Sequence, residues 1–287
     1  MATTALVLGA GGITGVAWHL GIVLGLRAEG VDLTGADLVV GTSAGAISGA
    51  LLAGDALLGG DAPLEGDALL GGGTGSTRAA ILTGPTAADV PPMEPDWTRG
   101  AEAFALLNSD APADEVRRRL GALALAADVG PQETVLDAFR RWLPLDDWPT
   151  TLVVTAVDAY TGDPVSWTAA SGVPILAAVA ASCAVPCIFP PVTVNGSRYV
   201  DGGVRSRTNA DLAAGHDRVV ILAPRMPLIL RDALASEMSQ LGEGTVLLEP
   251  DAASQEAIGG NVFAAGRWPQ ILTAATAQGR AAAAALS

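Results

Sequence analysis

A serine between two glycines is the first candidate for chemistry in this sequence. Residues 39–48 read VVGTSAGAIS, so β-branched residues run into Gly41-Thr42-Ser43-Ala44-Gly45. In the pattern Gly-x-Ser-x-Gly a strand ends, the chain turns sharply into a helix, and the glycines let the backbone pass close to itself. The serine then lies at a helix N-terminus, where negative charge is favoured. Because so short a pattern also occurs at ordinary strand–turn–helix joints, Ser43 is a candidate nucleophile that needs partners.

A glycine-rich segment at residues 9–15 (GAGGITG) also follows a short apolar strand and opens a helix. One interpretation is a dinucleotide site, but Thr14 occupies the place of the third glycine and the second strand does not end in an acidic residue. The other interpretation joins the two glycine motifs. If their strands are parallel neighbours, the N–H groups of Gly11 and Gly12 face a carbonyl attacked by Ser43. Such oxyanion donors contribute roughly 3–4 kcal/mol each.

A serine nucleophile needs a base, and the sequence has only two histidines. His19 lies inside the first predicted helix, and His216 precedes the strand predicted at 218–222, at the end of the sheet away from Ser43. Asp201 follows a predicted hairpin strand and precedes Gly202-Gly203, which allow close backbone approach. That setting suits positioned proton transfer, although Asp-Gly also begins ordinary turns. Locally, both roles of Asp201 stay open.

Strands that alternate with helices predict an α/β fold with a largely parallel sheet. Asn195-Gly196 indicates a type I′ hairpin between two of these strands. The predicted strands share apolar, β-branched composition and lie at residues 4–8, 36–40, 151–157, 164–168, 192–194, 198–200 and 218–222. The predicted helices lie at residues 15–28, 44–52 and 174–182, with an alanine-rich helical segment at 252–286.

Between these elements runs a variable excursion at about residues 54–147. It contains GDALLGG twice, at 54–60 and 66–72, which indicates a duplication in a surface loop around residues 54–78. Helical segments follow at 101–107, 114–127 and 133–142. These segments form either a cap over the sheet edge or a buttress beside it. Their role is equally open: they could be a lid over a site or an insertion without function.

Composition narrows the class of protein. Of 287 residues, 50% are hydrophobic, which is enough for a sizeable core. The net charge of −14 argues against nucleic-acid partners and against electrostatic docking on acidic membranes, while transient apolar contact with a membrane surface stays compatible. Cys183 and Cys187 form neither a zinc-ligand set nor a disulfide framework. With no basic leader and no apolar run of roughly 20 residues, we expect a cytoplasmic protein.

Together these segments resemble the patatin-like phospholipase family over roughly residues 3–225. GAGGITG resembles its oxyanion loop, GTSAG its nucleophile turn, and Asp201-Gly202-Gly203 its Asp-Gly-Gly/Ala motif. Residues 180–192 (AASCAVPCIFPPV) resemble its Ala-Ser…Pro…Phe-x-Pro stretch. The resemblance implies one three-layer α/β/α domain over residues 1–287. It also implies a Ser–Asp dyad of Ser43 and Asp201, oxyanion donors at Gly11 and Gly12, and hydrolysis of lipid acyl esters without a metal or cofactor.

Two departures from the family pattern bear on the substrate. Thr14 stands where the family usually carries Arg or Lys, and Ala10 replaces the first of three glycines. Both residues keep their N–H groups, but an anionic phospholipid headgroup loses a partner. A neutral ester, lysolipid or acyl-thioester is therefore the better expectation. The alternatives are a non-catalytic lipid-binding or interaction protein on the same fold and a nucleotide-binding oxidoreductase. The sequence carries no prediction of oligomeric state.

Overall fold

The computed structural model describes residues 2–53, 81–86, 89–91, 93–143, 147–225 and 233–286. The duplicated loop expected at residues 54–78 lies outside the described residues. The strands are β1 (Thr4–Leu8), β2 (Leu38–Gly41), β3 (Leu152–Asp158), β4 (Pro164–Trp167), β5 (Val192–Val194), β6 (Ser197–Asp201), β7 (Arg218–Leu222) and β8 (Thr245–Leu248). The helices are α1 (Gly12–Ala28), α2 (Ala44–Ala53), α4 (Trp97–Leu107), α5 (Ala113–Ala126), α6 (Gln132–Trp142), α7 (Ile175–Ser182), α8 (Leu234–Met238), α9 (Ala252–Ile258) and α10 (Trp268–Ala282).

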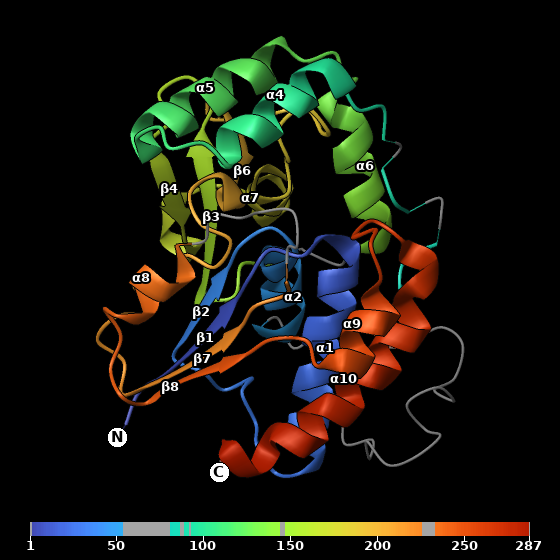
Figure 1. Ribbon diagram of the computed structural model, residues 1–287, viewed down its shortest axis with the longest axis vertical. Helices are drawn as coiled ribbons and strands as arrows, with labels where there is room; N and C mark the ends of the chain where they lie inside the picture. Colours follow the sequence, from blue (N-terminus) through green and yellow to red (C-terminus); the bar gives the residue numbers. More distant parts are fainter. Residues whose placement is uncertain are drawn as a thin grey trace.

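These strands form one mixed, mostly parallel sheet (Figure 1) in the order β5-β6-β3-β2-β1-β7-β8, with β4 paired to β3. The run β3-β2-β1-β7-β8 is parallel, whereas β4 and β6 pair with β3 in the antiparallel sense. Because β1 and β2 are parallel neighbours, the glycine loop after β1 and the serine turn after β2 leave the same edge of the sheet. The neighbourhood that the oxyanion interpretation requires is therefore confirmed.

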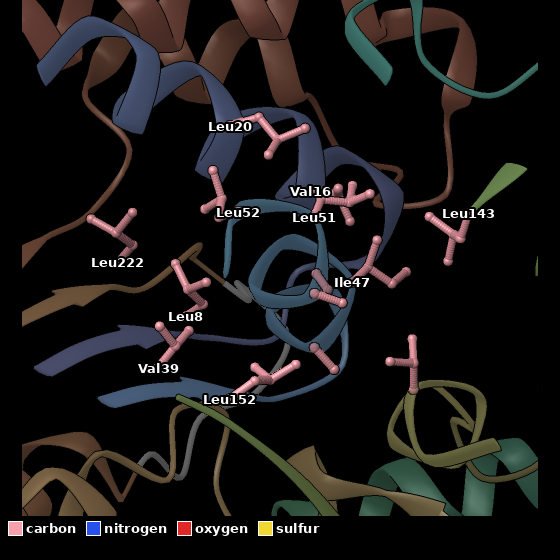
Figure 2. Packing of buried hydrophobic residues seen from close by; sticks show 14 of the residues in the cluster. Leu8, Val16, Leu20, Val39, Ile47, Leu51, Leu52, Leu143, Leu152 and Leu222 are labelled. Carbon is pink, nitrogen blue, oxygen red and sulfur yellow. The ribbon is translucent and has the colours of Figure 1, made fainter. Parts of the chain in front are cut away.

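Side chains of the central strands point alternately to the two faces of the sheet and are buried in two separate hydrophobic cores. Leu6 and Leu8 face α1 and α2, whereas Ala5 and Val7 face the opposite side, with α8 and a short 3₁₀ helix at Ala210–Ala213. Figure 2 shows the first of these cores, where leucines and valines of β1, β2, β3 and β7 meet side chains of α2. Helices cover both faces of the sheet, as the predicted α/β fold requires.

The excursion between α2 and β3 packs over the β3–β6 end of the sheet. Its helices α4 and α5 bury Leu106, Leu120 and Ala124 against Val157 and Val200. Helix α6 packs against α7 and lies below α4 and α5 in the view of Figure 1. Of the two alternatives for the excursion, the structure favours a cap.

Most predicted elements are confirmed within a few residues, including the hairpin partner β4 and the turn at Asn195-Gly196, where both residues have positive φ. Helix α1 begins at Gly12, earlier than expected. The prediction of one continuous helical segment at 252–286 is wrong. Gly259, with φ of +69°, ends α9, and α10 begins only at Trp268. Strand β8 and helix α8 were not predicted.

Candidate active site

Ser43 lies on a strained turn between β2 and α2. Its φ of +54° falls in the left-handed region that a serine rarely adopts. The flanking glycines are needed because a Cβ at Gly45 would lie 1.8 Å from the Leu8 carbonyl oxygen, and one at Gly41 would lie 2.7 Å from the Ala46 Cα. The Ser43 N–H donates to the Ser182 hydroxyl at 2.9 Å. The turn therefore has the geometry of a nucleophile elbow.

In the glycine loop after β1, Gly11 and Gly12 line the same cavity as Ser43. The N–H groups on either side are used: Ala10 donates to the Arg207 carbonyl at 2.7 Å and Thr14 to the Val262 carbonyl at 3.1 Å. For the N–H groups of Gly11 and Gly12, no hydrogen-bond partner is found among the described residues. Two such N–H groups at the start of a helix suit a developing negative charge.

Asp201 is the last residue of β6 and is only 4% exposed. Its Oδ1 accepts a hydrogen bond of 2.7 Å from the Gly203 N–H. Burial raises the pKa of Asp201 to about 7, against the opposing effects of the Gly203 N–H and the Ser43 side chain. A carboxyl group with a pKa near neutrality changes protonation in the working range of a general base.

One cavity of about 550 Å³ brings all four predicted site residues together. That volume is typical of a small-molecule or lipid site. Besides Ser43, Asp201, Gly11 and Gly12, its wall is mostly apolar and includes Ile13, Ile47, Trp97, Phe104, Leu107, Val135, Phe139, Trp142, Val185, Ile188, Phe189, Val204, Val262 and Phe263. Helices α4 and α6 supply several of these side chains, so the cap helices form part of the cavity wall.

Cationic side chains at the cavity are already engaged. Arg207 is part of the wall, but it donates to the Pro224 carbonyl at 2.9 Å and pairs with Glu249 at 3.4 Å. Thr14, in the place of the family's cation, is buried and directs its hydroxyl to the Gly11 carbonyl at 3.3 Å. Thr14 therefore stabilises the glycine loop and lies outside the cavity wall.

Neither histidine reaches the cavity. His19 is fully buried, its Nδ1 lies 3.1 Å from the Ser48 hydroxyl, and burial lowers its pKa to about 3. His216 lies before β7 and contacts the Ala213 carbonyl at 3.0 Å. The prediction that His216 is at the wrong end of the sheet is confirmed.

Asn209 joins the two halves of the site, and the sequence analysis missed it. It is buried with φ of +51°, and its Nδ2 donates to the Thr42 hydroxyl at 3.0 Å and the Ser206 carbonyl at 2.8 Å. The Thr42 hydroxyl is in turn 2.9 Å from that of Thr155, on β3. Asn209 thereby connects the turn before Ser43 to the segment after Asp201.

We expect Asn209→Ala to lower the free energy of unfolding by on the order of 2–3 kcal/mol, because the buried partners of its amide would stay unsatisfied. Asn195→Ala is the matched control. Asn195 has a similar φ of +49°, but it is exposed in a hairpin turn and its replacement changes only backbone strain. Urea unfolding of both variants measures the difference. Equal losses would contradict a structural role for the Asn209 network.

In the described part of the chain, no group of three or more His, Cys, Asp or Glu side chains is arranged to hold a metal ion. No helix in the same ranges has the length and apolarity to cross a bilayer.

Comparison with known proteins gives one family match. The model of patatin-like phospholipase matches residues 82–214, a segment that includes Asp201 and begins after Ser43. No curated protein sequence matches the chain. Among solved structures, VipD from Legionella pneumophila is 15% identical with a TM-score of 0.36, over 90% of this chain and 53% of that one. The type III effector protein ExoU is 17% identical with a TM-score of 0.35, over 97% and 53%. The chain thus spans about half the length of each.

Proposed function

Because the patatin-like phospholipase model matches residues 82–214, we propose that the chain is a serine acyl hydrolase of this family and cleaves lipid acyl esters with a Ser–Asp dyad. The observation that carries the proposal is the shared cavity. Ser43 on its strained turn, the buried Asp201 and the donors of Gly11 and Gly12 all line one mostly apolar space. An acyl chain fits such a wall, and the ester carbonyl then lies at the polar end.

In the first step, the Ser43 hydroxyl attacks the ester carbonyl and its proton passes to the Asp201 carboxylate. The bond from Ser43 Oγ to the carbonyl carbon forms, and the carbonyl oxygen becomes an oxyanion. The N–H groups of Gly11 and Gly12 stabilise this charge. When the tetrahedral intermediate collapses, the alcohol leaves with the proton that Asp201 holds. Water then attacks the acyl-enzyme by the reverse proton route and releases the fatty acid.

The environment of Asp201 decides whether a carboxylate can serve as this base. An aspartate in water has a pKa of about 3.9 and is a poor base for a hydroxyl group. Burial raises the pKa of Asp201 to about 7, so the proton affinity of the carboxylate increases without loss of its charge at mildly alkaline pH. The dyad therefore needs the dry cavity as much as it needs its two side chains.

The charges around the cavity favour a substrate without an anionic headgroup at the site. Arg207 is held by Pro224 and Glu249, and the acidic Asp89 and Asp96 line the wall. Among the described wall residues a phosphate would meet the Asp89 carboxylate and an Asp96 already paired with Arg99, and the cation Arg207 is engaged with Glu249. We therefore propose neutral esters, lysolipids or acyl-thioesters as the substrate class.

The test is covalent labelling with a fluorophosphonate, which reacts with activated serines. We expect labelling of the wild-type chain, identification of Ser43 as the modified residue by peptide mass spectrometry, and loss of labelling in Ser43→Ala. Ser48→Ala is the control, because Ser48 lies on α2, the helix that follows Ser43, and outside the cavity wall. An unlabelled wild-type chain that still binds fatty acid saturably would favour the non-catalytic alternative.

A further inference from the structure

Helix α4 carries an exposed apolar stripe. Trp97 is 76% exposed and Phe104 is 43% exposed, and both lie on one face because they are two helical turns apart. Ala101, one turn after Trp97, is exposed between them, and Met93, just before the helix, is 39% exposed. Large apolar side chains gathered at one exposed place mark a binding surface more often than single ones do. We call these four residues the α4 stripe.

The α4 stripe is continuous with the cavity. Trp97, Ala101 and Phe104 line the wall of the same cavity that contains Ser43. Their side chains are therefore exposed at one end and part of the wall at the other, so the stripe forms a rim of the opening. Whatever covers the rim is positioned to deliver an apolar chain into the cavity.

Charge restricts what can cover the rim. The chain has a net charge of −14, and Asp89 and Asp96 lie in the wall near α4. Arg99, the cation of this helix, pairs with Asp96 at 2.7 Å. Because that ion pair leaves no free cation on α4 in the described part of the chain, the net charge of −14 decides the interaction, and it repels an anionic surface but not a zwitterionic or neutral one.

The stripe is too small to hold a second copy of the chain. An aromatic side chain buries about 150–250 Å² when fully covered, and a stable interface needs about 800 Å² from each partner. With Trp97 at 76% exposure, Phe104 at 43% and Met93 at 39%, these three side chains supply roughly 240–400 Å², about a third to a half of that area. Insertion into a lipid interface needs no such area, since a few aromatic side chains at headgroup depth suffice.

We propose that the α4 stripe docks the protein on a zwitterionic lipid surface and that acyl chains enter the cavity along α4. The docking stands on the exposed stripe and the charges alone, while the entry of acyl chains rests on the proposed function. Trp97 inserts at the level of the headgroups, and Phe104 continues the apolar path toward the cavity.

The test is cosedimentation with phosphatidylcholine vesicles, made with chains that also carry Ser43→Ala so that no lipid is consumed. We expect Trp97→Ser combined with Phe104→Ser to lower the partition coefficient at least tenfold. The matched control is Tyr160→Ser. Tyr160 is 60% exposed at the turn between β3 and β4, outside the cavity wall, and its replacement should leave binding within twofold. At low salt, vesicles that also contain phosphatidylglycerol should bind less of the Ser43→Ala parent chain than pure phosphatidylcholine vesicles do.

Equal binding by the stripe variant and the parent chain, or tighter binding to phosphatidylglycerol than to phosphatidylcholine, would overturn the proposal. Light scattering on the same samples measures the oligomeric state. A dimer that dissociates in the stripe variant would show that a second copy of the chain, and not lipid, covers the α4 stripe. Vesicle binding needs no turnover. If the proposed hydrolase activity is wrong, that failure appears only in ester assays of the wild-type chain. The vesicle-binding result still tests the docking proposal.

Discussion

Replacing Ser43 with alanine should lower the hydrolysis of p-nitrophenyl acyl esters by on the order of 10⁴-fold or more, because loss of a nucleophilic serine removes the covalent route altogether. The loss should appear in kcat, since the cavity wall that holds the acyl chain is unchanged. Steady-state assays over short to long acyl chains measure it, and the best chain length describes the cavity. Ester hydrolysis that persists in Ser43→Ala would contradict the assignment of the nucleophile.

The same position should show the stability cost of the nucleophile turn. Ser43 has a φ of +54°, a conformation that glycine adopts freely. Ser43→Gly should therefore increase the free energy of unfolding by about 1 kcal/mol while abolishing activity. Ser48→Ala, on the unstrained part of α2, should retain activity and gain no stability. An inactive variant that is also more stable separates a catalytic loss from a folding defect.

The parts of the site that lie in short glycine motifs were predictable from the sequence. Gly41 is required by contacts with Gly45 and Ala46 inside its own turn, whereas Gly45 and Gly202 are required by the close approach of Leu8 and Thr155 from neighbouring strands. The largely parallel sheet was predictable as well, because strands alternate with helices. The adjacency of β1 and β2 entered only as a condition, and the structure supplies it. Each motif is a short run of residue types, so it can be read from the sequence even where the contacts that require its glycines come from another strand.

Long-range contacts account for what the sequence did not provide. The segment between α9 and α10 brings Val262 against the glycine loop, where its carbonyl accepts from Thr14, and Val262 and Phe263 complete the cavity wall. The alanine-rich composition favoured one continuous helix. Gly259-Gly260 was the available signal of a break. Strand β8 is short, forms the edge of the sheet and is only partly buried along its length, so it lacks the alternation that reveals a strand.

Asn209 illustrates the same limit for the site. A lone asparagine between Thr208 and Ala210 has no pattern, and its importance comes from partners on β3 and on the turn after β2. Its left-handed φ is typical of asparagine, but that is visible only in the folded chain. The cavity wall is a similar case, because α4, α6 and the segment after α9 meet only in the tertiary structure.

Asp201→Asn should lower kcat by about 10²–10⁴-fold, the usual contribution of a positioned general base. Asparagine keeps the shape and still accepts from the Gly203 N–H, so the loss reports the missing proton acceptor. In the wild-type chain, activity should rise with pH through an apparent pKa of about 7, because only the ionised Asp201 can take the Ser43 proton. Full activity of the wild-type chain at pH 5 would contradict this base.

Asp201→Asn, which should lower activity, should at the same time raise the free energy of unfolding. The pKa of Asp201 is raised in the folded chain from 3.8 to about 7, so the folded state holds a proton that the unfolded state has released between these values. The free energy of unfolding of the wild type therefore falls as the pH rises from about 4 to about 7. Asp201→Asn removes this penalty and should be more stable at pH 8 by on the order of a few kcal/mol, with the difference vanishing near pH 4.

Asp158, at the end of β3, provides a control because its pKa is shifted in the opposite direction to that of Asp201. Burial raises its pKa, but hydrogen bonds from Ser197, Thr161 and Tyr160 outweigh burial and lower the pKa below the usual aspartate value. The ionised form of Asp158 therefore stabilises the fold above that usual value, and the stabilisation is lost as the pH falls through the lowered pKa. Asp158→Asn should be less stable than the wild type at pH 8 and should keep its activity, because Asp158 lies outside the cavity wall. In urea titrations at pH 4 and pH 8, Asp201→Asn should gain stability over the wild type only at pH 8, whereas Asp158→Asn should be less stable than the wild type at both pH values, since both lie above the usual aspartate pKa. An Asp201→Asn variant that is less stable than the wild type at pH 8 would contradict a raised pKa at Asp201.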